Sequence, residues 1–278
     1  MKTADLHYHT NIHRMSVPQR QRRMKRIKNA LNSKPVDIIA STEHVYKAPI
    51  DAYLYLRDVG TETGTEVIAG IEALSTEGVE VIYLFRGERE LQRGLSDLRA
   101  FEWSIKDTAK IASNHDCVTI VPHPFTMGQT GAGNKMETDE YLGLLASVDY
   151  VEIHNGSSLS LRKLMNSRIP VDFNSAFRKK IEYTYDLPKQ YRGTDIGWAI
   201  GSDAHFPTEQ VCVGVSLDYD SKLSEFDNLK RRIRFEKHHI RPHSRIAKSM
   251  IKNGVCVANE YRIKKTIGRF QRNAAYSV

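Results

Sequence analysis

Short apolar segments, spaced along the first 205 residues, constrain the fold of this chain more than any other feature. They are rich in β-branched and aromatic residues, and we expect strands at residues 3–6, 36–40, 66–71, 79–85, 118–121, 150–153 and 198–200. Between them, residues 18–31, 96–113 and 138–146 have the pattern of helices. Strands that alternate with helices predict an α/β fold with a mainly parallel sheet.

Histidines and carboxylates stand at the ends of most of these segments. His7 and His9 follow the first one, and because residues two apart in an extended segment point the same way, both rings can reach one metal ion. Chance would scatter such side chains, whereas the strand ends of an α/β barrel converge on one face, where active sites lie. The candidate ligands are His7, His9, His13, His44, Glu72, His123, His154, Asp203 and His205.

The chemical nature of these side chains predicts the metals and the reaction. Histidine with carboxylate favours zinc, manganese or iron, and the set is larger than one tetrahedral zinc ion requires. Two or three divalent ions are therefore expected. Closely spaced ions polarise a phosphoryl oxygen and generate hydroxide near neutral pH, which predicts a phosphoesterase in which a bridging hydroxide attacks phosphorus. We expect Glu72 and Asp203 to be catalytic and Arg14 to add positive charge.

The order of these motifs resembles the PHP (polymerase and histidinol phosphatase) superfamily of metal-dependent phosphoesterases. The motifs extend over residues 1 to about 220 and are His7-x-His9, Thr42-Glu43-His44, Gly70-x-Glu72, Pro122-His123-Pro124, the strand-ending His154, and GSDAH at residues 201–205. The resemblance implies a distorted seven-stranded (β/α)7 barrel of the PHP type that cleaves phosphomonoesters or phosphodiesters. Known members include histidinol phosphatases, nucleases and domains of DNA polymerases.

The resemblance also implies how the ligands divide among three ions. By this similarity the first ion takes His7, His9, Glu72 and Asp203; the second takes Glu72, His123 and His154; and the third takes His44 and His205, with His13 as their partner. Two features depart from the family pattern. Glu43 stands where the family has aspartate, which leaves its role open. Residues 171–197 are longer and more polar than the expected helix, and they form either a lid or a neutral insertion.

The charge distribution predicts a second part of the chain and a polyanionic partner. Residues 229–278 carry a net charge of +12, so the rest of the chain carries −4 of the total of +8. We expect a barrel at residues 1–228 and a basic C-terminal extension at residues 229–278 that packs on the barrel or projects from it. Nucleic acid is the expected partner of this extension, and a protein such as an ATPase subunit is the alternative. Residues 14–28 are also basic and are either a solvated helix face or further support for a polyanionic substrate.

Three functions stay open from the sequence. A nuclease or other phosphodiesterase acting on DNA or RNA is preferred, a phosphomonoesterase of small molecules like histidinol phosphatase is the second, and a non-catalytic PHP module that binds a protein is the third. The chain has no run of about 18 apolar residues, so no membrane span is expected. The lack of an apolar signal segment and the wide spacing of the three cysteines favour the cytoplasm.

Overall fold

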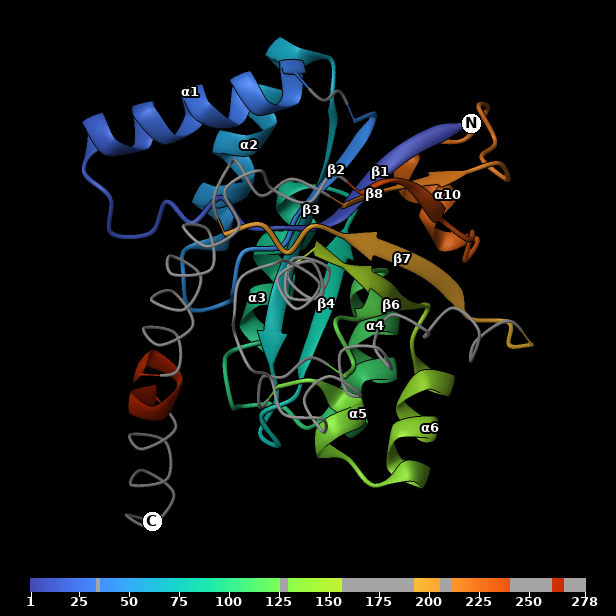
Figure 1. Ribbon diagram of the computed structural model, residues 1–278. Helices are drawn as coiled ribbons and strands as arrows, with labels where there is room; N and C mark the ends of the chain where they lie inside the picture. Colours follow the sequence, from blue (N-terminus) through green and yellow to red (C-terminus); the bar gives the residue numbers. More distant parts are fainter. Residues whose placement is uncertain (34–35, 126–129, 157–192, 206–211, 241–261, 268–278) are drawn as a thin grey trace, which may run out of the picture.

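A sheet that contains nine strands among the described residues, almost closed into a barrel, forms the centre of the protein. The computed structural model describes all residues except 34–35, 126–129, 157–192, 206–211, 241–261 and 268–278 (Figure 1). The strand order is β7-β6-β5-β4-β3-β2-β1-β8-β9. The strands are β1 (Lys2–Tyr8), β2 (Ile38–Ser41), β3 (Glu66–Leu74), β4 (Glu80–Phe85), β5 (Val118–Val121), β6 (Tyr150–Asn155), β7 (Gly197–Gly201), β8 (Cys212–Ser216) and β9 (Glu236–Ile240).

Helices connect these strands and cover the outside of the sheet. They are α1 (Val17–Ser33), α2 (Pro49–Thr63), α3 (Glu88–Asp97), α4 (Thr108–His115), α5 (Ala132–Lys135), α6 (Thr138–Ser147) and α10 (Glu225–Lys230), with a 3₁₀ turn η1 (Ile105–Asp107). Figure 1 shows α1 lying beside α2 at one end of the molecule. No helix in the described ranges combines the length and the apolarity that crossing a membrane requires.

Hydrogen bonds from β7 and the loop after it to β1 and to the start of β9 bring the sheet close to closure. The amide of Asp203 donates to the carbonyl of His7 at 2.8 Å, and the amide of His9 donates to the carbonyl of Ala204 at 3.2 Å. At the other end of β7, the amide of Phe235 donates to the carbonyl of Trp198 at 3.0 Å. The end of β7 is thereby fastened to β1, although these strands lie far apart in the strand order.

The expected strands are all present, but their arrangement differs from a seven-stranded parallel barrel. Two further strands, β8 and β9, extend the sheet beside β1, and both pair antiparallel. β4 is antiparallel to both β3 and β5, because a tight turn at residues 75–79 reverses the chain directly after β3. The structure therefore has a mixed α/β sheet, and the specific (β/α)7 form stays a prediction, as does a domain boundary at residue 228, which falls within α10.

The prediction of one helix over residues 96–113 is wrong for the middle of that segment. α3 ends at Asp97, and the chain then passes through Phe101, which has a positive φ of 62°, before η1 begins. Ser104 starts this turn with a capping box, because its hydroxyl accepts from the amide of Lys106 and its own amide donates to Asp107. The apolar side chains of Leu98 and Trp103 are buried by this detour, so packing outweighs the local helical pattern.

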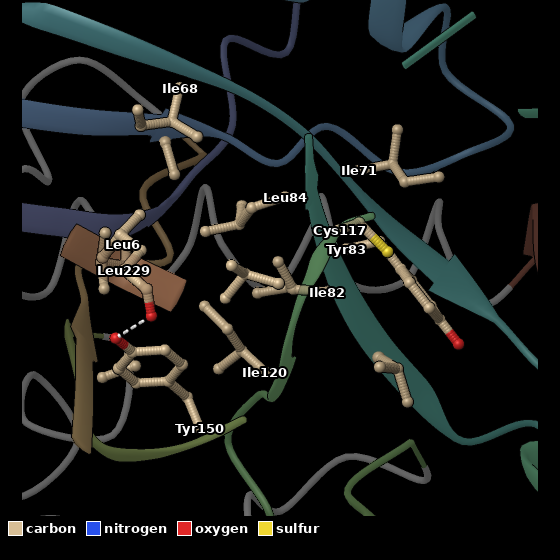
Figure 2. Packing of buried hydrophobic residues seen from close by; sticks show 14 of the residues in the cluster. Leu6, Ile68, Ile71, Ile82, Tyr83, Leu84, Cys117, Ile120, Tyr150 and Leu229 are labelled. Carbon is tan, nitrogen blue, oxygen red and sulfur yellow. Dashed lines mark hydrogen bonds between the residues drawn. The ribbon is translucent and has the colours of Figure 1, made fainter. Parts of the chain in front are cut away.

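Part of the core lies inside the nearly closed sheet, because Ile82 and Ile120 are register partners on the same face as Glu72. Figure 2 shows aliphatic side chains from β1, β3, β4 and β5 packed together, among them Leu6, Ile82 and Ile120. The hydroxyl of Tyr150 donates to the carbonyl of Leu229 at 2.5 Å, which ties α10 to β6 (Figure 2). Full burial of each such side chain stabilises the fold by roughly 1.5 to 3 kcal/mol, so the strand ends stand on a rigid support.

Candidate metal centre

One edge of the barrel gathers buried histidines and carboxylates from several strands. Because β1, β2, β3, β5, β6 and β7 run in one direction, their carboxyl ends lie at this edge. Four overlapping groups of possible ligands occur among the described residues, and the ligand atoms of each group lie within 4.8 Å of one another. The members, called the donor cluster below, are His7, His9, His44, Glu72, Glu80, His123, Asp203 and His205.

His7, His9 and Asp203 form the first group. Nε2 of His7 lies 3.0 Å from Nε2 of His9, and Oδ1 of Asp203 lies 3.7 Å from the former nitrogen and 3.5 Å from the latter. Two ligand atoms that each lie about 2.1 Å from one ion are separated by roughly 3.0 to 3.4 Å. The observed separations are therefore close to those that a single metal ion requires, and the residues present fit such an ion.

Glu72 connects this group to its neighbours. Its Oε1 lies 3.5 Å from Nε2 of His7 and 3.1 Å from Nε2 of His123. Its Oε2 lies 2.7 Å from Nδ1 of His44 and 3.5 Å from Nε2 of His9. Each carboxylate oxygen thus faces a different pair of imidazoles, which is the arrangement that lets one carboxylate bridge two cations.

The loops after β2 and β7 bring in the histidines of a third group. The amide of Val45 donates to the carbonyl of Glu72 at 3.0 Å, and the amide of Glu72 donates to the carbonyl of Glu43 at 3.2 Å. These bonds hold His44 against β3. The ring centroid of His205 lies 4.7 Å from that of His9 and 6.1 Å from that of His44, so three imidazoles from three strand ends meet there.

Glu80 is a member of the donor cluster that the sequence did not reveal. Its carboxylate is 3% exposed and lies 3.9 Å from Nδ1 of His44 and 3.8 Å from Nε2 of His123. It also forms an ion pair with Lys264, which belongs to the basic C-terminal extension. Because β4 runs antiparallel to β3, its first residue, not its last, reaches this edge. A search for ligands at the ends of strands therefore misses Glu80.

A second buried carboxylate, Glu152, supports the cluster from β6. Its Oε1 accepts from Nδ1 of His7 at 3.2 Å, and its Oε2 accepts from the amide of His123 at 2.6 Å. The first bond places the proton on Nδ1 and leaves the lone pair of Nε2 facing the other ligand atoms. This is the carboxylate–histidine support typical of metal sites. A glutamate flanked by apolar residues in a buried strand was the available signal for it in the sequence.

Glu43 and Asp5 also lie behind the ligands. The amide of Asn11 donates to Glu43 at 2.6 Å, and Glu43 Oε1 lies 3.5 Å from Nδ1 of His9. The residue whose role the sequence left open thus holds the loop after β1 beside His9. Asp5 accepts from the amide and hydroxyl of Ser202 at 2.9 and 2.6 Å, and burial raises its pKa to about 7. It joins β1 to the loop that carries Asp203.

The charges of the cluster favour bound cations. Burial opposes protonation of His123, but the Glu72 carboxylate outweighs it and raises the pKa of His123 to about 9. The pKa of His7 is likewise raised, because Glu152, Asp203 and Glu72 surround it and overcome the effect of burial. The pKa of Asp203 is lowered, since His7 and other imidazoles outweigh burial. Without metal, protons supply the positive charge that these carboxylates require, and a metal ion can replace them.

Two members of the cluster have backbone conformations that are costly for residues other than glycine. The φ angle is 28° at His123 and 48° at Asp203. Such positions cost on the order of 1 to 3 kcal/mol each and occur mainly at functional sites. His123 lies between Pro122 and Pro124, which restrict the chain on both sides. The fold therefore maintains backbone strain at the two positions whose side chains point into the donor cluster.

Three residues expected at the site lie outside the donor cluster. His154 belongs to β6, and burial together with the charge of Lys237 lowers its pKa to about 4. His13 and Arg14 belong to the loop after β1, where Arg14 is exposed and has a φ of 58°. Neither histidine appears in the groups formed by the described residues. Residues 171–192 of the possible lid and most of the basic extension lie outside the described residues, and residues 193–197 lead into β7.

Two solved structures have a fold similar to that of this chain. PsfC from Pseudomonas syringae PB-5123 superimposes with a TM-score of 0.57 at 14% sequence identity, over 93% of this chain and 98% of that one. The lesion-specific endonuclease PfuEndoQ from Pyrococcus furiosus superimposes with a TM-score of 0.52 at 12% identity, over 87% of this chain. This chain spans 59% of the length of that endonuclease.

At these identities the likeness concerns the fold alone. No model of a protein family matches the sequence. No curated protein matches it either.

Proposed function

We propose that this protein is a metal-dependent hydrolase of phosphate esters that acts on the phosphodiester bonds of nucleic acid. The observation that carries the proposal is the position of Glu72, whose two oxygens face separate histidine pairs within a buried cluster of ligand atoms. Clusters of this kind hold two or more closely spaced ions. Divalent ions held there polarise a phosphoryl oxygen and make water acidic enough to attack phosphorus near neutral pH.

The residues divide naturally among two or three ions. Histidine with carboxylate favours manganese, zinc or iron. We assign the ligands as His7, His9, Asp203 and Glu72 for the first ion, Glu72 and His123 for the second, and His44 and His205, with Glu80 within reach, for the third. His154 and His13, which the family resemblance adds to the second and third ions, are the least supported ligands, because neither joins a group of converging ligand atoms among the described residues.

The side chains of the chain itself have distinct tasks in this proposal. Asp203 stays ionised because its pKa is lowered by the surrounding imidazoles, so it is a better ligand than proton acceptor. Asn155 donates to both Glu152, at 3.1 Å, and Asp203, at 3.2 Å, and thereby holds these carboxylates in place. Arg14 is exposed on the loop after β1, where we assign it the charge that meets the phosphoryl oxygens of the substrate.

Nucleic acid is the preferred substrate for two reasons. The basic residues of this chain gather in the extension and in α1, and a polyanion is the partner that such segments attract. One of the proteins with a similar fold is a lesion-specific endonuclease. A small phosphomonoester would have no need of basic surfaces outside the site.

A panel of substrates tests the proposal. Purified protein with Mn²⁺ is expected to hydrolyse a chromogenic phosphodiester and DNA or RNA faster than a chromogenic phosphomonoester. Glu72→Gln and Asp203→Asn should each lower turnover by orders of magnitude, since each removes a charged ligand. Glu140→Gln, at an exposed glutamate of α6, is the matched control and should be fully active. No hydrolysis of any ester with Mn²⁺, Zn²⁺ or Fe²⁺ would refute the function, and preference for the monoester would refute the substrate class.

A further inference from the structure

The outer face of α1 carries a concentrated positive charge. Within its 17 residues, α1 contains six lysines and arginines and no acidic residue. Arg22, Lys25 and Arg26 are all exposed. Residues three and four apart lie side by side on a helix, so these three charges form one continuous patch, here called the α1 patch.

The other basic residues of α1 form ion pairs or hydrogen bonds within the protein. Arg20 lies 3.6 Å from Asp51, Lys28 forms an ion pair with Glu62, and Nη1 of Arg23 donates to the carbonyl of His205 at 3.2 Å. The residues of the α1 patch, in contrast, have no acidic partner in the described ranges. Like charges four residues apart destabilise a helix. The patch is therefore an uncompensated surface that an anionic partner would stabilise.

The same helix is fastened to the donor cluster. Arg23 and Asn11 both donate to the carbonyl of His205, at 3.2 and 3.4 Å, and His205 is a member of that cluster. Arg23 stands directly between Arg22 and the buried side of α1. A strand bound on the α1 patch would therefore lie next to the edge of the barrel at which the ligands converge.

The apolar side of α1 restricts the class of partner. Ile27 and Leu31 are buried and Met24 packs against the core, so the helix has no continuous apolar face to insert into a membrane. α1 also contains no aromatic residue on which the bases of a single strand could stack. What it offers is positive charge over residues 22–26, about 6 Å of helix, which corresponds to roughly two base-pair steps of a duplex.

We propose that the α1 patch binds the phosphate backbone of duplex DNA, independently of sequence, and holds the duplex beside the donor cluster. This inference rests on the proposed function, because it assigns that site its substrate. It also assigns the substrate contact to a helix of the barrel, in addition to the basic C-terminal extension. Backbone contacts by lysine and arginine position a duplex without specifying its sequence.

A pair of matched double variants tests the patch. Arg22→Gln with Arg26→Gln removes two exposed arginines four residues apart on α1. Arg89→Gln with Arg93→Gln removes two exposed arginines with the same spacing on α3. The start of α3 lies toward the opposite edge of the barrel, because α3 follows the carboxyl end of the antiparallel strand β4. Binding of a fluorescent 20-base-pair DNA duplex would be followed between about 50 and 200 mM NaCl, in EDTA so that no cleavage occurs.

The α1 variant is expected to bind the duplex less tightly. The slope of log K against log[NaCl], here called the salt slope, should become less steep by about two, since each lost phosphate contact reduces it by roughly 0.9. The α3 variant should match the wild type within about twofold. Lys25→Gln alone should flatten the slope by about one. Equal weakening of both double variants, or wild-type binding by the α1 variant, would overturn the inference. The inference would also be overturned if the wild type bound single-stranded DNA more tightly than duplex DNA. It would be overturned as well if the α1 variant lost binding to vesicles of anionic lipid while its DNA binding stayed unchanged.

A second measurement separates this inference from the proposed function. With Mn²⁺, both double variants should hydrolyse a small chromogenic phosphodiester at the wild-type rate. If the wild type hydrolyses that ester but binds no DNA at low salt, DNA binding by the α1 patch is refuted, whereas the proposed hydrolase activity is retained. If DNA binding depends on the patch but no ester is hydrolysed, the patch stands and the hydrolase is refuted.

Discussion

Glu152 Oε1 lies 3.2 Å from Nδ1 of His7, and both side chains are almost completely buried. The carboxylate therefore determines which nitrogen of His7 faces the donor cluster. Its second oxygen accepts from the amide of His123 at 2.6 Å, so one side chain sets the positions of ligands from two strands.

Replacement of this carboxylate should weaken metal binding. In Glu152→Gln one acceptor oxygen becomes an amide that must point its hydrogens at either His7 or the amide of His123. We expect metal affinity to fall by about 10- to 100-fold, as is typical for groups that support metal ligands. Calorimetric titration with Mn²⁺ or Zn²⁺ measures the change, with Glu140→Gln as the control. Unchanged affinity would mean that Glu152 contributes to folding alone.

The two strand-ending histidines should differ in their importance. His123 Nε2 lies 3.1 Å from Glu72, whereas His154 lies outside the converging groups among the described residues. We expect His123→Asn to remove at least one metal ion per chain, and His154→Asn to retain the wild-type metal content. Elemental analysis after gel filtration measures both. A loss of metal in His154→Asn would show that His154 is a ligand, as the family resemblance implies.

Metal binding should release protons and weaken at low pH. The pKa of His123 is raised to about 9 by Glu72 in the metal-free protein, so this ring is protonated at pH 7, and an ion must displace its proton. Apparent affinity should therefore increase as the pH rises toward about 9. At a single pH near 7, the heat of binding should differ between two buffers with different ionisation enthalpies. Identical heats would indicate that no proton leaves the site.

Gly201 should tolerate no side chain. A Cβ atom at this position would lie 2.2 Å from Cβ of His7 and 2.4 Å from Oε1 of Glu152. Gly201→Ala should lower the free energy of unfolding by about 1 to 3 kcal/mol or more, because the side chains it meets are packed against the cluster. Urea denaturation measures this loss, and metal affinity should fall with it.

Gly143 offers the matched comparison. It lies within α6, where an added Cβ would meet nothing within 4 Å. Gly143→Ala should stabilise the protein by up to about 1 kcal/mol, since alanine favours a helix over glycine. If both alanine variants changed stability alike, the close packing around Gly201 would be refuted.

The sequence by itself was enough to predict seven of the nine described strands and most members of the donor cluster. Short apolar segments form strands from local preferences, and a polar residue that ends a buried strand needs a partner. The local pattern therefore selects His7, His9, Glu72 and Asp203 as candidate ligands. The position of His44 followed from the same pattern, since it comes three residues after the end of the short apolar strand β2.

The tertiary structure alone decided which residues meet and which helices break. Glu80 reaches the cluster because β4 turns back antiparallel to β3, so the first residue of β4 lies at the edge where β3 ends. Glu152 lies among the ligands while His154, two residues later, does not, because the pairing of β6 with β7 shifts between these two residues. The register of β6 against β7 depends on contacts between segments far apart in the chain, so it becomes visible only when the barrel is assembled.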